Sequence, residues 1–581
     1  MKCNHWLVYP RNMSEDSGFD SEDIQTVRKY ALQNSIEYGG EGKTGSVLGR
    51  VLAERSELRP YAKELLELVE SEVHRANSLT RENGIEEART ELMKIDPSAL
   101  ERQKHQKKKG LPDLPGDTTK VVLRFAPNPN GPLSIGHSRG VVINSRYAER
   151  YNGEIVLRFD DTDTRVKPPI VEAYEWIEED FEWLSGRSAD ITIRASERMP
   201  IYLKQAEKMI SEGHGYVCRC SARKFRGFRE AKTDCPCRGR EISESLEDWG
   251  AMNAGEINEG DAVVRVRTEM SLPNPALRDW PALRIQHSPH PIIGEKYKVW
   301  PLLDFQSAVE DHEQGVSHII RGKDLMDSTR KQTLLYEHFG WTYPETLYWG
   351  RVKVHGFGRF STSGMSSSII SGKFSGWGDP RLPTLRALRN RGFEAQSLID
   401  LWEEIGLTQK DIAISMKTLE AFNSKNIDGT CERRVFVSNP ITLGISSDGY
   451  PDRARIAKHP EGKIPGTREW EVGRSIFIQE SDYNQGKIRL KDFADIEISG
   501  SDAIIESEAR SDERQIIHWL PEKMSRSARL FIPVGEKIRE VGGMIEDLDL
   551  RVGEIYQFER LGFARIDCIE DDVVDIFWLH G

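Results

Sequence analysis

Long apolar runs and excess positive charge are both missing from this chain of 581 residues. No stretch approaches the ~18 consecutive apolar residues that a membrane-spanning helix needs, and Met1–Trp6 does not begin an apolar signal-peptide core. We therefore expect a cytoplasmic protein with no membrane partner. The formal net charge of −12 argues against nonspecific nucleic-acid binding by bulk attraction, although screening within about 8–10 Å leaves room for a local basic groove.

Cysteine is also scarce, and it is unevenly distributed. Four of the seven cysteines form a Cys-x-Cys pair and a Cys-Pro-Cys pair: Cys218, Cys220, Cys235 and Cys237. An odd number with such a cluster indicates thiolate metal chemistry in a reducing compartment rather than a disulfide framework. The four thiolates predict a tetrahedral, structural Zn²⁺ site. Reduced thiols left over from a lost site are the alternative.

The first half of the chain changes character near residue 118. Residues 1–118 predict a helical extension and a linker, because apolar residues between Ala62 and Val73 recur with a helical period and a Lys-rich, Pro/Gly-rich stretch follows. Residues 119–393 alternate strand and helix patterns. They predict a Rossmann-like α/β domain with a parallel sheet and an insertion at about residues 214–295.

The second half changes again near residue 431. Residues 394–430 predict a helical connector. Residues 431–581 contain short apolar runs separated by Asn-Pro, Asp-Gly and Pro-Gly punctuation, a pattern typical of all-β barrels. The predicted protein is thus multidomain, with helical, α/β and all-β parts in that order.

The stretch Arg124–His137 is the most informative part of the chain. It follows the apolar run Val121–Leu123 and leads into a helical pattern through Val141 and Tyr147. A strand, a Pro/Gly loop and a helix N-terminus in this order direct free backbone N–H groups at an anion, which suits the phosphates of ATP. A purely structural Gly-His pair at a helix start is the alternative.

Two further segments carry charged side chains that suit a ligand crevice. Arg158–Asp163 lies at the end of the predicted strand Glu154–Phe159, and the carboxyl end of a parallel strand faces the ligand. Without that context its acidic run would be a solvated turn. Asp311–Asp324 contains Arg321, whose guanidinium fork can pair with a carboxylate through two parallel hydrogen bonds. A structural ion pair with a nearby acid is the alternative for Arg321.

These segments resemble the signatures of class I aminoacyl-tRNA synthetases. Ser134–His137 is similar to the HIGH motif, and the Arg-Phe-Ala-Pro-Asn-Pro-Asn-Gly sequence before it is similar to the glutamyl/glutaminyl branch. Arg359–Ser363 resembles a variant of the KMSKS loop, which closes over the triphosphate. Gln515–Trp519 and Gly553–Asp567 resemble the β-barrel anticodon-binding region of the archaeal type. The resemblance covers most of the chain and implies an archaeal-type glutamyl enzyme.

The resemblance also implies roles for individual residues. Asp160 is expected to hold the α-ammonium of glutamate, and Arg124 and Arg321 its γ-carboxylate. The expected ATP-binding residues are Asn128, Gly131, Ser134, Gly136, His137, Asp324 and Arg359. The residues expected to stabilise charge in the reaction are His137, Arg359, Ser361 and Ser363.

Four positions depart from the family pattern. Ser134 replaces the first histidine of the HIGH motif, and Leu303 replaces a tyrosine of the amino-acid pocket. Arg359 and Thr362 replace the two lysines of the KMSKS motif. The loop is therefore expected to depend more on hydroxyl groups, backbone donors and Mg²⁺.

The implied reaction activates L-glutamate with ATP and Mg²⁺ and transfers it to the terminal adenosine of tRNA(Glu), with tRNA(Gln) as a second acceptor left open. Arg321 favours glutamate, because a neutral amide would leave its buried charge unpaired at a cost of roughly 2–5 kcal/mol. The alternatives are a glutaminyl-tRNA synthetase and a noncatalytic tRNA-binding paralogue. A monomer is expected.

Overall fold

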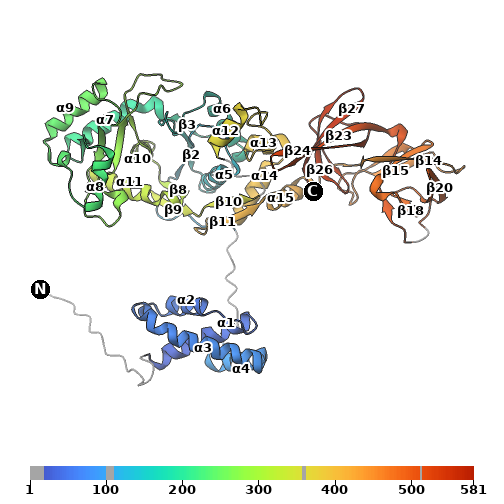
Figure 1. The fold of residues 1–581 in the computed structure, drawn as a ribbon, viewed down its shortest axis with the longest axis horizontal. Helices are drawn as coiled ribbons and strands as arrows, with labels where there is room; N and C mark the ends of the chain where they lie inside the picture. The colour runs from blue at the N-terminus through green and yellow to red at the C-terminus, as the bar shows by residue number, and fades with distance from the viewer. Residues whose placement is uncertain (1–18, 98, 100–109, 356–360, 511–512) are drawn as a thin grey trace. The chain divides into compact units, whose positions relative to one another are not determined.

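The computed structural model describes residues 19–97, 99, 110–355, 361–510 and 513–581. The chain divides into two compact units, residues 1–107 and residues 108–581 (Figure 1). Among the described residues, no helix is both long and apolar enough to cross a bilayer. The basic run Lys104–Lys109, predicted as part of a linker, lies outside the described residues.

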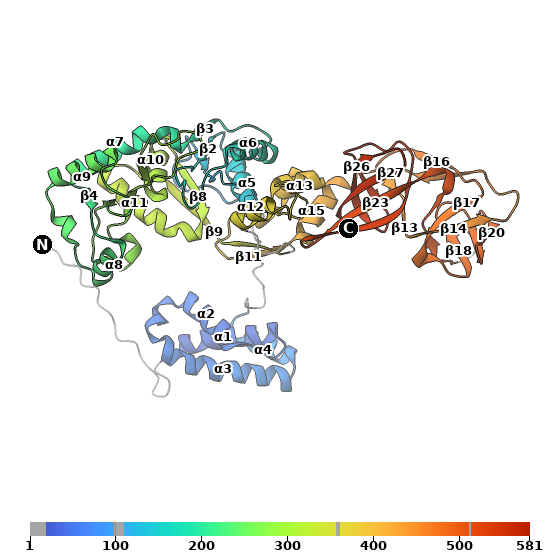
Figure 2. The same ribbon diagram turned by 45° about the horizontal axis from the view of Figure 1, so that its top comes forward.

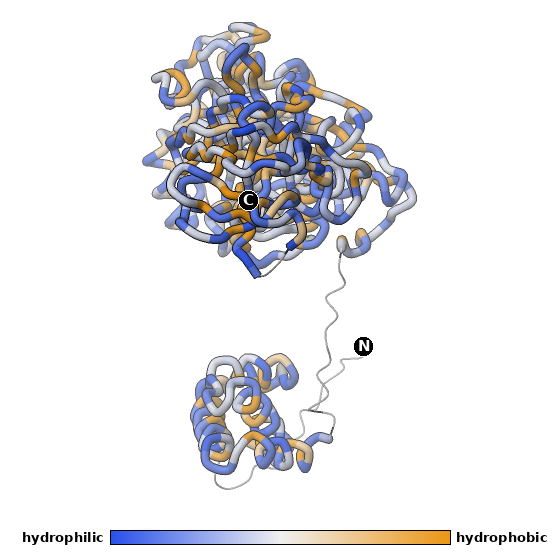
Figure 3. Tube along the Cα trace, turned by 90° about the vertical axis from the view of Figure 1, so that its right-hand side faces the viewer, coloured by the Kyte–Doolittle hydropathy of each residue, from blue (hydrophilic) through white to orange (hydrophobic). Residues whose placement is uncertain are grey.

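The first unit is helical, as predicted. Its α-helices are α1 (Ser21–Glu37), α2 (Thr44–Glu54), α3 (Ala62–Glu82) and α4 (Ile85–Ile95). The apolar face predicted from the sequence lies on α3, where Leu65, Val69 and Val73 are buried in the core of the unit. Hydrophobic and hydrophilic segments alternate along these helices (Figure 3), as expected when one face of each helix is buried.

Two adjacent parallel sheets form the centre of the second unit's α/β part. One contains β1 (Val122–Phe125), β2 (Glu154–Phe159) and β3 (Ile191–Arg194), and the other β8 (His318–Gly322) and β9 (Glu345–Trp349). The pairs β1–β2, β2–β3 and β8–β9 are parallel. The backbone N–H of Ser317, just before β8, donates to the carbonyl oxygen of Val122 at 3.0 Å, so β8 lies beside β1. The Rossmann-like α/β prediction is confirmed.

Helices connect and flank these strands. They are α5 (Ile135–Arg150), α6 (Val171–Ser185), α10 (Leu303–Glu313), α11 (Met326–Phe339) and α12 (Thr362–Ile370). The helix predicted after His137 is α5, and its N-terminus lies directly after the loop that follows β1. This is the arrangement in which backbone N–H groups point at an anion.

A small antiparallel sheet interrupts the α/β part. Its strands are β4 (Gly215–Cys218), β5 (Val263–Val266), β6 (Pro281–Ile285) and β7 (Val299–Pro301). Three helices accompany it: α7 (Met199–Ser211), α8 (Ala222–Ala231) and α9 (Ile242–Ala254). Trp280 and Trp300 are buried in its core, which also includes residues of α10 and α11, so the small sheet packs against the α/β part.

Helices and a short strand pair follow the α/β part. They are β10 (Val352–His355) parallel to β11 (Ile412–Ser415), with α13 (Leu385–Arg391), α14 (Ala395–Ile405) and α15 (Met416–Ile427). The Nδ2 of Asn423 on α15 hydrogen-bonds the Nε2 of His580 at 2.8 Å, which joins these helices to the C-terminal strands.

The C-terminal region consists of two seven-stranded sheets and a hairpin (Figure 2), which confirms the all-β prediction. One sheet has the order β12 (Arg433–Arg434), β25 (Ile555–Phe558), β26 (Gly562–Ile569), β27 (Val573–His580), β23 (Ser525–Val534), β24 (Lys537–Glu546) and β13 (Phe436–Ser438). The other has the order β21 (Ile516–Ile517), β18 (Gly486–Leu490), β19 (Asp495–Ser499), β20 (Asp502–Ser507), β14 (Pro440–Ile445), β17 (Ser475–Gln479) and β22 (Trp519–Pro521). The hairpin pairs β15 (Arg453–Ala457) with β16 (Thr467–Glu471).

Candidate functional site

Three neighbouring parallel strands each place a buried arginine near their carboxyl end. Arg124 lies on β1, Arg158 on β2 and Arg321 on β8, and their exposed fractions are 8%, 1% and 5%. The carboxyl ends of parallel strands open onto the ligand crevice of such a sheet. The three charges are close enough to interact, since Arg321 and Arg158 add to the effect of burial in lowering the pKa of Arg124.

Two buried carboxylates balance part of this charge. The Oδ1 of Asp311 accepts hydrogen bonds from Arg124 Nε at 3.2 Å and from Arg158 Nη1 at 2.7 Å. The Oδ1 of Asp160 accepts one from Arg158 Nε at 2.9 Å. We call Arg124, Arg158 and Arg321, together with Asp160 and Asp311, the arginine cluster. Three guanidinium groups face two carboxylates, so the cluster keeps one positive charge for a ligand.

Burial and mutual attraction compete in setting the charge of these groups. Burial opposes ionisation of Asp311, but the attraction of Arg124 and Arg158 prevails and lowers the pKa of Asp311. At Arg158, the attraction of Asp160 and Asp311 likewise prevails over burial and raises the pKa. Burial prevails at Asp160, where it raises the pKa of the carboxyl group, and at Arg124, where it lowers the pKa of the guanidinium. The Arg158–Asp311 pair is therefore a lasting ion pair.

The guanidinium of Arg158 is saturated by the protein. Its Nε binds Asp160, its Nη1 binds Asp311, and its Nη2 donates to the hydroxyl of Ser307 at 2.8 Å. Each of the three guanidinium nitrogens thus already donates to the protein, and in this sense the group is saturated. Arg158 therefore holds the two carboxylates in place.

The guanidinium of Arg321 is only half used. Its Nη1 donates to Gln332 Oε1 at 2.9 Å and to Thr329 Oγ1 at 3.4 Å. Its Nε is buried without a hydrogen-bond partner, and Nη2 makes no hydrogen bond within the described part of the chain. No carboxylate of the described residues forms an ion pair with Arg321. The structural-ion-pair alternative thus lacks a partner there, and the free Nε–Nη2 edge has the shape that a carboxylate needs.

The loop after β1 fixes the ring of His137. Ser134 is the N-cap of α5, and its backbone N–H donates to His137 Nδ1 at 3.2 Å. Because Nδ1 accepts this bond, the neutral ring carries its proton on Nε2, which is a donor on an exposed side chain. The Nδ2 of Asn128 donates to the carbonyl oxygen of Asp160 at 2.9 Å, so the loop is also tied to the strand end that carries the acid.

The segment Ser361–Ser363, which resembles the second class I signature, lies close to the loop that resembles the first. A Cβ atom at Gly131 would lie 2.9 Å from Thr362 Cγ2, so only glycine permits this close approach. Ser361 is the N-cap of α12, and its Oγ accepts a hydrogen bond from Gly364 N at 3.1 Å. The hydroxyls of Ser361 and Ser363 are 3.2 Å apart and exposed.

Other predicted site residues are not part of these contacts. Arg359 lies outside the described residues. Asp324 is exposed just after β8 and forms no ion pair with the arginine cluster in the described ranges, and Gly136 is exposed at the start of α5. Leu303, at the start of α10, is 49% exposed and brings no hydroxyl to the site. The ATP-binding roles of Asp324, Gly136 and Arg359 remain predictions.

Sequence reasoning missed several side chains of this site. Gln306 on α10 donates from Nε2 to Asp160 Oδ1 at 2.7 Å. Gln332 on α11 contacts Arg321, and Asp311 joins two arginines. Arg158 and Asp160 are two positions apart at the end of β2, and residues at that spacing in an extended chain lie on the same face. This spacing could have predicted their contact. No sequence signal links Gln332 to Arg321, because their contact depends on how α11 packs.

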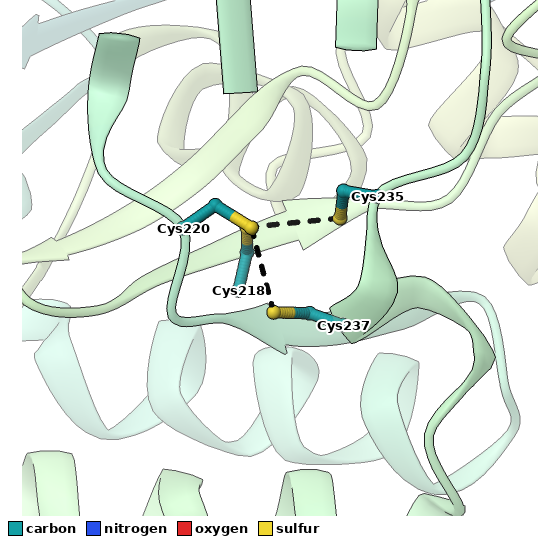
Figure 4. A group of neighbouring side chains, drawn as sticks. All are labelled: Cys218, Cys220, Cys235 and Cys237. Carbon is teal, nitrogen blue, oxygen red and sulfur yellow. Dashed lines mark hydrogen bonds between the residues drawn. The ribbon is translucent and has the colours of Figure 1, made fainter. Parts of the chain in front are cut away.

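The four clustered cysteines converge on one point (Figure 4). Their Sγ atoms lie within 4.8 Å of one another, and the distances are 3.9 Å from Cys218 to Cys235 and 3.7 Å from Cys220 to Cys237. A tetrahedron with Zn–S bonds of about 2.3 Å has sulfur atoms about 3.8 Å apart. The residues therefore fit a Zn²⁺ ion.

Groups around the cysteine cluster already stabilise negative sulfur. The backbone N–H of Arg219 lies 3.3 Å from Cys237 Sγ as a donor, and Tyr216 Oη lies 3.5 Å from Cys235 Sγ. The hydrogen bond from Cys218 lowers the pKa of Cys235 to about 5. At least one thiolate is thus available as a metal ligand at neutral pH.

Family comparisons agree with this geometry. Residues 120–429 match the catalytic domain of the class I tRNA synthetases for E and Q, and residues 431–512 match the anticodon-binding domain of the same enzymes. The chain belongs to the class I aminoacyl-tRNA synthetases of the glutamyl and glutaminyl branch. The family membership predicted from the motifs is confirmed.

Three archaeal relatives align with nearly all of the chain. A glutamate–tRNA ligase of Archaeoglobus fulgidus is 41% identical over 95% of this chain and 99% of that protein. One of Methanosarcina barkeri is 42% identical over 96% of this chain and 99% of that protein. One of Pyrococcus abyssi is 41% identical over 95% of this chain and 98% of that protein.

Proposed function

We propose that the protein is a glutamate–tRNA ligase. The observation that carries this proposal is the free Nε–Nη2 edge of Arg321, within a cluster that keeps one positive charge. L-Glutamate brings a net charge of −1, so its γ-carboxylate satisfies the guanidinium, whereas glutamine would leave a buried charge unpaired.

The reaction is adenylation followed by acyl transfer. The α-carboxylate of glutamate attacks the α-phosphorus of Mg·ATP, the bond to the β-phosphate breaks, and pyrophosphate leaves. The 2′-hydroxyl of the terminal adenosine of tRNA(Glu) then attacks the glutamyl carbonyl, and AMP leaves. Neither step requires much acid–base work from the protein, so positioning and charge stabilisation supply the catalysis.

The described residues suit these tasks. Asp160 receives the α-ammonium, and Arg321 and Arg124 receive the γ-carboxylate. The Nε2–H of His137 and the backbone donors at the start of α5 face the phosphates. The hydroxyls of Ser361 and Ser363 stabilise the departing pyrophosphate, and the motif assigns the same task to Arg359, outside the described residues.

Other parts of the chain serve the tRNA. Zn²⁺ held by the four cysteines would supply fixed geometry for the insertion that contacts the acceptor end. The C-terminal strands would bind the anticodon, because exposed arginine and aromatic side chains on β-sheets stack with unpaired bases. The enzyme would act as a monomer in the cytoplasm.

Aminoacylation of purified tRNA(Glu) and tRNA(Gln) with each amino acid tests the proposal. We expect charging of tRNA(Glu) with glutamate at a kcat/KM far above that with glutamine. Charging with glutamine alone would identify a glutaminyl enzyme, and no charging of either tRNA would identify a noncatalytic paralogue. Glutamate attached to tRNA(Gln) would extend the acceptor range without changing the reaction.

A further inference from the structure

Gln332 is the only group other than a threonine hydroxyl that hydrogen-bonds Arg321 within the described residues. It is 1% exposed and lies on α11. Its Oε1 accepts from Arg321 Nη1 at 2.9 Å and from the hydroxyl of Tyr343 at 2.7 Å. Its Nε2 donates to the carbonyl oxygen of Asp304 at 3.1 Å.

These partners leave the amide one orientation. Arg321 can only donate and the carbonyl oxygen of Asp304 can only accept, so a flipped amide would lose both of these hydrogen bonds. The oxygen therefore holds Nη1 of Arg321 firmly. Because the guanidinium is planar, fixing Nη1 also fixes the orientation of the Nε–Nη2 edge on its other side.

The neutrality of Gln332 matters as much as its position. Arg124 and Arg158 are both paired with carboxylates of the protein, whereas Arg321 is held by an amide and a hydroxyl. A carboxylate in the place of the amide would still accept from Arg321 and Tyr343, would lose the hydrogen bond donated to Asp304, and would cancel the one positive charge that the arginine cluster keeps.

We propose that Gln332 is a specificity-determining positioning residue, which orients Arg321 for a carboxylate substrate while leaving its charge unneutralised. This rests on the proposed glutamate–tRNA ligase function. Gln332 touches no reacting atom. It acts through Arg321 by keeping the cluster attractive to glutamate and poorly matched to glutamine.

The decisive variant is Gln332→Glu, which changes the charge and nearly preserves the shape. Aminoacylation of tRNA(Glu) is measured with glutamate and with glutamine at saturating ATP. We expect kcat/KM for glutamate to fall by about 10–100-fold, mainly through KM. The ratio of kcat/KM for glutamate over glutamine should fall by at least about 10-fold, while the KM for ATP stays within about 2-fold.

Two controls separate charge from hydrogen bonding. Gln332→Met removes the hydrogen bonds but keeps the site neutral, so kcat/KM for glutamate should fall by about 3–10-fold with the glutamate/glutamine ratio kept within about 3-fold. Tyr343→Phe removes the other donor to the same oxygen, and we expect a loss of less than about 3-fold.

A second carboxylate guards against failure of the first variant to fold. Thr329→Asp places an acid near the same Nη1 from a half-buried position and should lower the glutamate/glutamine ratio by about 3–10-fold. If folded Gln332→Glu, or Thr329→Asp in its place, keeps the wild-type ratio within about 2-fold, the proposal is overturned. Equal losses in Gln332→Glu and Gln332→Met with an unchanged ratio would show a merely structural role. Wild-type charging of glutamate decides the ligase function separately.

Discussion

The arginine cluster and the cysteine cluster are both small groups of buried polar side chains, but only the cysteine cluster is symmetrical about one point. Four sulfur atoms within 4.8 Å of one another offer equivalent ligands for one ion. The arginine cluster contains one saturated guanidinium, Arg158, and one half-used guanidinium, Arg321. A substrate site needs unpaired charge to attract a ligand that comes and goes. A structural metal site does not, because its ligands enclose a single ion.

The largest expected effect comes from removing the surplus charge. Arg321→Met should lower kcat/KM for glutamate by about 10²–10³-fold, because the γ-carboxylate loses its bidentate partner. The melting temperature should stay equal or rise, since Arg321 repels Arg124 in the ligand-free protein. Aminoacylation kinetics and thermal unfolding measure the two quantities. A variant that charges glutamate at the wild-type rate would refute the role of Arg321.

The same substitution at the saturated arginine should give the opposite pattern. Arg158→Met leaves Asp160 and Asp311 without their shared partner, and breaking such a buried pair costs about 3–5 kcal/mol of unfolding free energy. We expect a lower melting temperature than that of Arg321→Met, measured by thermal or denaturant unfolding. Equal stability of the two variants would remove the distinction between saturated and half-used arginines.

Removing one cysteine ligand should damage the insertion. We expect about one zinc ion per wild-type chain and near zero in Cys235→Ser. Amide exchange in the segment around Cys218 and Cys237 should become faster, because metal binding stabilises that fold. Zinc analysis and hydrogen exchange provide the measurements. Cys568→Ser, an exposed cysteine outside the cluster, is the matched control and should keep its zinc.

The smallest expected effect is on the pH dependence of stability, through the buried neutral side chain of His580. Burial lowers the pKa of His580 from 6.5 to about 4. The folded state thus resists protonation while the unfolded state takes up a proton below pH ~6.5, so this contribution is complete above pH ~6.5 and is lost as the pH falls toward about 4. The loss is at most about 3 kcal/mol.

Unfolding measured between pH 7.5 and 4.5 tests this dependence. His580→Gln should flatten the acid-side loss relative to wild type, because an amide does not titrate. The carboxylates shared by both proteins cancel in the difference. An identical pH dependence in the two proteins would show that His580 does not set it.

Local chemistry made much of the fold predictable. Strand β2 has the bounds Glu154–Phe159 that the apolar run predicts, and the loop after β1 leads into α5 as its Pro/Gly pattern indicates. Asp160 was found because it follows a strand whose carboxyl end faces the crevice, and Arg321 because its segment resembles the amino-acid pocket of the family. Turn punctuation likewise indicated the C-terminal strands.

Contacts between distant segments were not predictable in the same way. Asp311 binds Arg124 across 187 positions of the chain, and Gln332 reaches Arg321 from a helix. Such pairs depend on the register of strands and the packing of helices, which one sequence does not encode locally. The role of Ser134 was also hidden, since the family pattern marks it as a lost histidine, whereas the structure makes it an N-cap.

The pairing of Ser134 with His137 has a consequence for how such enzymes are recognised. A text pattern that demands two histidines at this motif would pass over the chain. A search for an imidazole whose Nδ1 is engaged by the backbone at the start of a helix would find it. The direction of the Nε2 proton of His137 is set here by the backbone of a serine N-cap, so a histidine at position 134 is not needed to set it.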